Sequence, residues 1–459
     1  MNAADQNQKN LRVVMFPWLG YGHISPFLEL AKKLSLRNFT IFICSTPATL
    51  NPIRKKLGDE FSGSVEFTEL HLPSSDDLPS DLHTTNGLPP HLMPALKEAF
   101  DEACPSFVKL LEDLRPDLLI YDFLQPWAPL AAADLNIPAV EFISSSSTMT
   151  AYMVHRFKQP GVDFPFSNVR FRDYELKRFA RMAAETPPER EQKDKNRVRD
   201  CFARSCGLVL IKSFEEIEGK YSSYITKLTG KNVVPVGPLI QEPCTEDENS
   251  EVIRWLNGKE EKSTVFVSFG SEYFLSEEDT CEIAHGLESS NVNFVWVLRF
   301  PKGQDREITD VLPERFSGRV GERGLVVKGW APQAKILQHP SIGGFVSHCG
   351  WSSVMEAMKY GVPIIAVPMH IDQPVNARLA EEVGVAVEVS RDGEGKLRRE
   401  KITAVINTIV TEEGGERVRS TAAAMREMLA EKGDKEIITV VEELRKLCDK
   451  KTHDFTPVF

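Results

Sequence analysis

The sequence lacks the features that would place it in a membrane or outside the cell. Its first ten residues are polar and contain no apolar core of a signal peptide. Its most apolar stretches, such as 362–371, fall far short of the ~18–20 residues that cross a bilayer. The eight cysteines are scattered, and none forms a Cys-x-x-Cys pair. We therefore expect a cytoplasmic protein with reduced thiols and no structural zinc.

The chain also has no excess of positive charge. Its 459 residues include 55 Lys and Arg against 66 Asp and Glu, which gives a net charge of −11. Hydrophobic residues make up 42% and charged residues 26%, which is typical of a folded globular protein and excludes a disordered or fibrous one. The acidic balance disfavours nucleic-acid binding, so a phosphorylated ligand would need a local site.

Apolar runs alternate with helical patterns along the whole chain. In the first half, a strand, a turn, a helix and further strands are predicted at 12–17, 20–25, 26–36, 39–44, 117–121 and 139–143. In the second half, strands are predicted at 264–269, 293–298, 324–328, 344–347 and 363–367. Such alternation predicts an α/β protein with two doubly wound, Rossmann-like domains built on parallel sheets.

Composition suggests where these domains begin and end. We expect an N-terminal domain at 1–240, an interdomain linker at 241–262, a C-terminal domain at 263–440 and a C-terminal helix and tail at 441–459. Residues 161–199 are charged with weak periodicity, which predicts a mobile surface excursion. The pattern of apolar and charged residues in 415–451 predicts two charged amphipathic helices.

Gly20-x-Gly22-x-x-Ser25 half-matches a dinucleotide-binding turn. The third glycine is absent, and no acidic residue ends the next strand, so NAD binding is disfavoured. His23 lies in this turn and Asp122 directly follows another strand. Both therefore belong at carboxyl strand ends, where a carboxylate can orient an imidazole that acts as a base. From these two residues alone, an Asp122 that merely caps the next helix stays open.

Residues 330–373 carry the most specific pattern. They read Trp330-Ala-Pro-Gln333, His348-Cys-Gly-Trp-Ser-Ser353, Glu356, Gly361-Val-Pro363 and Asp372-Gln373. Any one of these residues could be a core or capping residue, but the ordered set resembles the signature box of plant secondary-product UDP-glycosyltransferases. Residues 17–23, 236–238 and 268–271 also resemble that family. The resemblance implies the GT-B architecture, in which two Rossmann-like domains face each other across a cleft.

The resemblance implies how the box would hold the nucleotide. Trp330 would stack on the uracil, the backbone of Ala331 would pair with its edge, and Gln333 and Glu356 would hold the ribose. His348 would contact a phosphate.

The diphosphate would meet Ser271 and the backbone around Gly350, Ser352 and Ser353. A helix that begins there would present N–H groups to the anion. The family has Asn where this chain has Ser352, so we expect weakened donor binding.

At the sugar end, Trp351, Asp372 and Gln373 would contact the hydroxyl groups of the donor sugar. With Gln373 as its last residue, the box resembles that of enzymes that prefer UDP-glucose. His23 would deprotonate an acceptor hydroxyl, and Asp122 would orient His23. Attack on the face opposite UDP would then convert an α-linked donor into a β-glucoside by inversion. The sequence has no Asp-x-Asp motif, so neither a metal nor a cofactor is expected.

Residues 15–23, 70–75 and 82–91 resemble the branch of the family that adds a sugar to an existing sugar. The implied acceptors are flavonoid or triterpenoid glycosides, and Trp18, Ser144 and Ser145 are candidate acceptor-binding residues. Three alternatives stay open: transfer to an aglycone hydroxyl, a nucleotide-sugar epimerase and a non-catalytic UDP-sugar-binding protein. The expected partners are a UDP-sugar and a glycoside, with no nucleic acid and no membrane span, and the chain is expected to be a monomer.

Overall fold

The computed structural model describes residues 9–243, 250–270, 273–301 and 306–449, which form two compact units. The first unit contains the chain up to Val162, residues Ala183–Leu239 and the C-terminal residues from Asp434. The second unit contains Asp163–Met182 and Ile240–Gly433.

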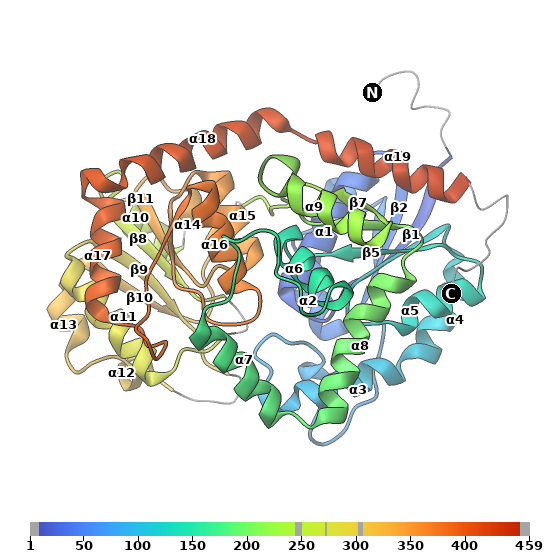
Figure 1. The fold of residues 1–459 in the computed structure, drawn as a ribbon, viewed down its shortest axis with the longest axis horizontal. Helices are drawn as coiled ribbons and strands as arrows, with labels where there is room; N and C mark the ends of the chain where they lie inside the picture. The colour runs from blue at the N-terminus through green and yellow to red at the C-terminus, as the bar shows by residue number, and fades with distance from the viewer. Residues whose placement is uncertain (1–8, 244–249, 271–272, 302–305, 450–459) are drawn as a thin grey trace. The chain divides into compact units, whose positions relative to one another are not determined.

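The first unit is built on a parallel sheet with the strand order β3-β2-β1-β4-β5-β6-β7. Figure 1 labels β1, β2, β5 and β7 of this sheet. Its strands are β1 (Leu11–Phe16), β2 (Phe39–Ser45), β3 (Val65–Glu69), β4 (Leu118–Tyr121), β5 (Ala139–Ile143), β6 (Leu208–Ile211) and β7 (Asn232–Pro235).

Both faces of this sheet are buried. Val13 and Met15 of β1 belong to one hydrophobic cluster, and Val14 and Phe16 belong to another, because successive side chains point to opposite faces. This explains why β1 reads as an unbroken apolar run. The helices of this unit are α1 (Tyr21–Ser35), α2 (Pro47–Arg54), α3 (Met93–Glu102), α4 (Cys104–Leu114), α5 (Trp127–Asp134), α6 (Ser147–Lys158), α8 (Pro188–Arg204), α9 (Glu215–Thr229) and α19 (Lys435–Asp449).

The second unit has a parallel sheet with the order β10-β9-β8-β11-β12-β13. Its strands are β8 (Thr264–Ser268), β9 (Asn293–Leu298), β10 (Gly324–Lys328), β11 (Ile342–Ser347), β12 (Ile364–Ala366) and β13 (Ala386–Glu388). In each sheet the first strand lies beside the fourth, so β1 pairs with β4 and β8 pairs with β11. The strand order reverses at these two pairs, and such switch points are where open α/β sheets bind ligands.

The helices of the second unit are α10 (Glu251–Leu256), α11 (Glu277–Ser290), α12 (Ile308–Val311), α13 (Phe316–Val320), α14 (Gln333–Gln338), α15 (Trp351–Tyr360), α16 (Gln373–Val383), α17 (Arg399–Val410) and α18 (Glu416–Lys432). Helix α7 (Asp173–Glu185) begins in the second unit and ends in the first. Short 3₁₀ helices lie at Asp59–Phe61, Ser80–Leu82, Pro90–Leu92, Gly321–Arg323 and Glu413–Gly415.

The structure confirms the predicted fold class of two Rossmann-like domains and the two amphipathic helices near the C-terminus, α18 and α19. Residues 161–199, predicted to be a mobile surface excursion, are largely exposed and contain α7 and most of α8, and side chains near and on α7 form buried ion pairs. Neither helix was predicted from the sequence, although the apolar residues of α7 recur at helical spacing.

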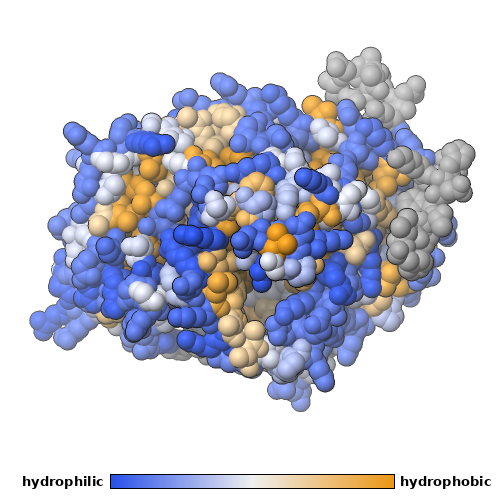
Figure 2. All heavy atoms as spheres, in the orientation of Figure 1, coloured by the Kyte–Doolittle hydropathy of each residue, from blue (hydrophilic) through white to orange (hydrophobic). Residues whose placement is uncertain are grey.

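The predicted domain boundary at residue 240 adjoins the unit boundary after Leu239. Helix α19 begins at Lys435, before the predicted start at 441, and packs against α1 and β7 of the first unit. Residues 244–249 of the predicted linker lie outside the described part of the chain. Among the described residues, no helix combines the length and apolarity that a membrane span requires. On the face drawn in Figure 2, hydrophilic residues predominate and apolar residues are scattered among them.

Candidate active site

His23 and Asp122 meet at the switch point of the first sheet. His23 lies in the first turn of α1, which begins at Tyr21 after the turn that follows β1, earlier than the predicted start at 26. Asp122 directly follows β4. Because β1 and β4 are neighbours, Nδ1 of His23 lies 2.9 Å from Oδ2 of Asp122.

The carboxylate of Asp122 is fully buried and held by backbone donors. The N–H group of Trp18 donates to Oδ2 at 3.0 Å, and the N–H group of Phe123 donates to Oδ1 at 2.8 Å. Hydrogen bonds from backbone N–H groups stabilise the charged form of a carboxylate. An ionised Asp122 favours the His23 tautomer with its proton on Nδ1, which leaves Nε2 as the base.

The loop after β5 brings a serine to the same imidazole. Oγ of Ser144 lies 3.2 Å from Nδ1 of His23. The next residue, Ser145, is half-buried. Trp18 is only 4% exposed and its indole packs edge-on to Phe100, so the part of Trp18 that reaches the site is its backbone N–H group. Of the three candidate acceptor residues, Ser144 therefore lies against the proposed base, and the Trp18 indole lies in the core.

Glu218 of α9 anchors this serine loop, and sequence reasoning missed it. Its carboxylate accepts hydrogen bonds from the N–H group of Thr148 at 2.7 Å and from the hydroxyl of Thr148 at 2.6 Å. Ser146 caps the same helix, α6, by accepting from the N–H group of Met149 at 3.2 Å. Burial raises the pKa of Glu218 to about 7. No sequence motif marks Glu218, because its partner lies 70 residues away.

His348 occupies the corresponding switch point of the second sheet, after β11. A Cβ atom on Gly270, which follows β8, would lie 2.7 Å from Nε2 of His348, and one on Gly350 would lie 2.6 Å from it. Both positions therefore need glycine for the imidazole to fit. Burial, with a smaller contribution from His370, lowers the pKa of His348 to about 3. The imidazole is neutral near pH 7 and can serve a phosphate as a hydrogen-bond donor.

Helix α15 begins beside this histidine. Gly350 is its N-cap residue and provides no side-chain cap, so the first N–H groups of α15 point out of the helix end. Trp351 is 4% exposed, with its indole buried, and Ser352 is half-buried. A helix N-terminus next to a neutral imidazole suits an anion such as a diphosphate. Ser271, also predicted here, lies outside the described residues.

Gln333 and Glu356, the two residues that the family resemblance assigns to the ribose, are in contact. Nε2 of Gln333 donates to Oε2 of Glu356 at 2.7 Å and to Oγ of Ser353 at 3.2 Å. Trp330 is 59% exposed, which leaves a ring face available for stacking, whereas Ala331 is buried.

Asp372 and Gln373 lie at the start of α16. Oδ2 of Asp372 accepts a hydrogen bond at 2.8 Å from Nδ2 of Asn376, which also donates to the carbonyl of Cys349 at 3.1 Å. Asn376 thereby ties Asp372, near the end of the box, to Cys349, just before α15, a role the sequence did not reveal. Oε1 of Gln373 accepts from the N–H groups of Met369 and His370, each at 3.0 Å. That oxygen shapes its own loop. The amide nitrogen lies 3.1 Å from Nδ1 of His370, and its second hydrogen can donate to a sugar.

Within the described ranges, the structure contains no group of three or more His, Cys, Asp and Glu side chains placed to hold a metal ion.

Two family models match the chain on either side of the unit boundary. The model "Glycosyltransferase, N-terminal domain" matches residues 9–241, which include His23 and Asp122. The model "UDP-glucoronosyl and UDP-glucosyl transferase" matches residues 228–414, which include the whole box from Trp330 to Gln373.

Individual proteins match over nearly the full length. The chain is 52% identical to a mogroside IIIx synthase of Siraitia grosvenorii, over 97% of this chain and 95% of that protein. It is 46% identical to a β-D-glucosyl crocetin β-1,6-glucosyltransferase of Gardenia jasminoides, over 95% and 99%. A solved UDP-glucosyltransferase from Polygonum tinctorium superposes with a TM-score of 0.78 at 26% identity, over 97% and 100% of the two chains. These matches show that the chain belongs to the plant UDP-glycosyltransferases of GT-B fold and is itself a UDP-glycosyltransferase.

Proposed function

We propose that the protein is an inverting glucosyltransferase that moves glucose from UDP-glucose to a sugar hydroxyl of a flavonoid or triterpenoid glycoside. The observation that carries the chemistry is the 2.9 Å contact between His23 and a fully buried Asp122. The acceptor class is supported by the 46% identical relative, whose name gives a glucosylated acceptor and a sugar-to-sugar linkage.

In the proposed reaction His23 acts as the general base. Nε2 takes the proton of the acceptor hydroxyl while its oxygen attacks the anomeric carbon on the face opposite UDP. The new carbon–oxygen bond forms as the bond to the diphosphate oxygen breaks, and UDP leaves with the electron pair. Asp122 stabilises the imidazolium that forms, as a buried carboxylate does in other base-activated sites. Inversion of an α-linked donor gives a β-linked product.

The second unit would hold the donor. Trp330 would stack on the uracil, and Gln333 with Glu356 would hold the ribose. The N–H groups at the start of α15 and the neutral His348 would offset the charge that develops on the departing diphosphate. Asp372 and the amide nitrogen of Gln373 would hold the hydroxyl groups of the glucose.

This charge stabilisation requires no metal ion. We expect excess EDTA to leave the initial rate unchanged, because helix N–H groups and His348 replace the cation that other transferases place on the diphosphate. The assay measures UDP release before and after chelation. A loss of rate that manganese restores would overturn this part of the proposal.

Ser352 stands where the family has asparagine. A hydroxyl reaches less far than an amide, and a lost hydrogen bond to a charged group weakens binding by about tenfold. We therefore expect Ser352→Asn to lower the KM for UDP-glucose by at most about tenfold. The effect is smaller where a water molecule already bridges the Ser352 hydroxyl and the phosphate. Ser420→Asn on the exposed face of α18 is the matched control. Unchanged KM and kcat in Ser352→Asn would refute the expectation.

Product analysis tests the proposed reaction. A monoglucosylated flavonoid or triterpenoid incubated with UDP-glucose should gain one hexose by mass spectrometry. The coupling constant of the new anomeric proton should be that of a β-linkage. An α-linked product would refute inversion, and conversion of UDP-glucose to another UDP-sugar without transfer would indicate an epimerase.

We also propose that the enzyme acts as a monomer in the cytoplasm. No disulfide joins the cysteines in the described part of the chain, which fits a reducing compartment. Light scattering of the purified protein tests the monomeric state, and a dimer mass would contradict it.

A further inference from the structure

Residues 163–182 leave the first unit and belong to the second, although the chain on both sides of them belongs to the first. We call this segment the strap. We infer that the strap positions the sugar loop, residues 368–373, which carries Asp372 and Gln373. This inference rests on the proposed function, in which these two residues hold the donor sugar.

Buried ion pairs fix the strap to the second unit. Glu175 and Arg378 lie 2.7 Å apart, and each side chain is only 7% exposed. Arg378 belongs to α16, the helix that follows the sugar loop, and its Nη1 donates to the carbonyl of Pro374 at 2.6 Å. Arg172 pairs with the buried Glu388 at 2.5 Å. Removing one partner of a buried pair leaves an uncompensated charge, so these contacts hold the strap firmly.

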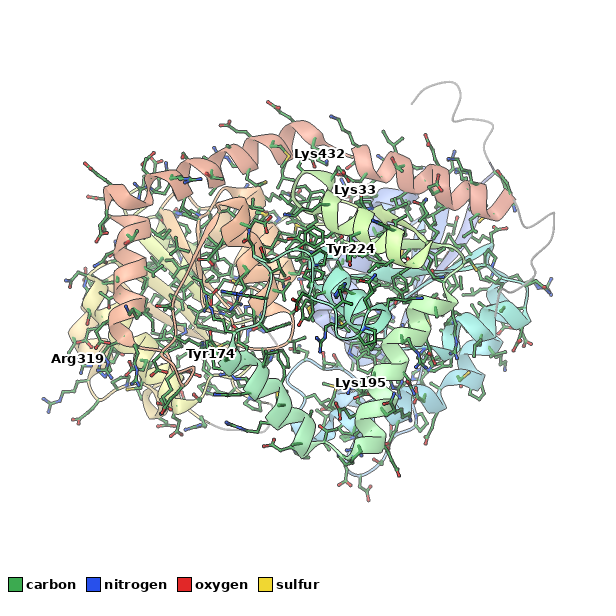
Figure 3. All side chains as sticks on the ribbon, viewed as in Figure 1. Lys33, Tyr174, Lys195, Tyr224, Arg319 and Lys432 are labelled. Atoms are coloured by element: carbon green, nitrogen blue, oxygen red, sulfur yellow. The ribbon has the colours of Figure 1, made fainter. Side chains whose placement is uncertain are left out.

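The strap also packs closely against a second loop of this unit. Tyr174, labelled in Figure 3 near the start of α7, lies over Gly395. A Cβ atom at Gly395 would lie 2.8 Å from the tyrosine ring, and the positive φ of 82° there also favours glycine. The absence of a side chain at Gly395 therefore makes room for the Tyr174 ring of the strap.

Arg178 of the strap reaches the sugar loop itself. Its Nη1 donates to the carbonyl of Met369. Nη2 of Arg391 donates to the preceding carbonyl, that of Pro368, at 3.1 Å. With the N–H groups of Met369 and His370 bound by Gln373, the backbone of the loop is held at successive peptide groups.

These contacts hold a strained residue next to Asp372. Ile371 has φ of 55°, a conformation that β-branched residues rarely adopt, and its side chain is 57% exposed. Such strain persists only where the surrounding structure imposes it. Arg178 binds the backbone of this loop from the strap, so Arg178 is a positioning residue for Asp372.

The test compares UDP with UDP-glucose on the full-length protein. We expect Arg178→Ala to weaken UDP-glucose binding by about tenfold, the effect of one lost charged hydrogen bond, while UDP binds within about twofold of wild type. Arg181→Ala, at an exposed position one turn further along α7, is the matched control and should change neither affinity. Calorimetric titration gives both affinities.

A second substitution separates positioning from general damage. Glycine adopts a positive φ without strain, so Ile371→Gly in the Arg178→Ala background should restore UDP-glucose binding. Equal losses for UDP and UDP-glucose in Arg178→Ala, or no loss, would overturn the inference, as would the absence of rescue.

Asp372→Ala distinguishes this inference from the proposed function. We expect it to weaken UDP-glucose binding and to spare UDP. If Asp372→Ala changes neither affinity, the proposed role of the sugar loop fails. If Asp372→Ala acts and Arg178→Ala does not, only the role of the strap fails.

Discussion

Replacing His23 with alanine is expected to lower kcat by about 10²–10⁴-fold, the usual contribution of a general base. His23 stands at the β1–β4 switch point with Nδ1 bound to a buried carboxylate, so Nε2 is the atom placed to accept the acceptor proton. The residual rate would come from the donor site, which the substitution leaves intact. The measurement is the initial rate of UDP release with saturating UDP-glucose and a monoglucoside.

The KM for UDP-glucose should change little in His23→Ala, because the donor-binding residues belong to the second unit. His285→Ala is a suitable control, since His285 pairs with Glu288 within α11, away from both switch points. A His23→Ala enzyme that keeps more than about a tenth of the wild-type kcat would contradict the assignment of the base.

Asp122→Asn should lower kcat by about 10⁴-fold, the loss that follows when the carboxylate of a base-orienting pair becomes an amide. The amide cannot stabilise the imidazolium. It would also turn its NH₂ group toward at least one backbone donor, since both Trp18 and Phe123 donate to the carboxylate. A buried donor left without a partner costs about 1–3 kcal/mol, so we also expect a lower melting temperature.

Asp117→Asn provides the comparison for this substitution. Asp117 lies at the opposite end of the same strand, where it accepts the N–H group of Arg12 at 2.9 Å and pairs with Lys9. Its loss should lower stability without lowering kcat. If Asp122→Asn and Asp117→Asn each lowered kcat only as far as they lowered stability, Asp122 would be a structural residue and the mechanism would be wrong.

The sequence predicted most of the strands, because burial on both faces produces unbroken hydrophobic runs. It did not predict β3, which is partly exposed, nor β6, β7 and β13, which have three or four residues. Segments this short carry too few residues for a period to be recognised. Length alone does not decide the outcome, because β4 and β12 are equally short and were predicted.

For the site, the sequence placed His23 and Asp122 at strand ends, and parallel pairing of β1 with β4 then brought them together. It could not show that Ser144 reaches the same imidazole, or that Glu218 and Arg178 hold the loops around the site. Those contacts depend on the directions of single side chains across long sequence separations. The indoles of Trp18 and Trp351 were expected at ligands but are buried, since an aromatic residue beside a site often packs beneath it.

The central claim is that the acceptor is a sugar already attached to an aglycone. The most direct measurement is a competition in which an aglycone and its monoglucoside, at equal concentration, share UDP-glucose with the enzyme. The proposal predicts that mass spectrometry finds the diglucoside while the aglycone stays unmodified. Glucosylation of the aglycone in preference to the monoglucoside would contradict the claim and leave an aglycone glucosyltransferase in its place.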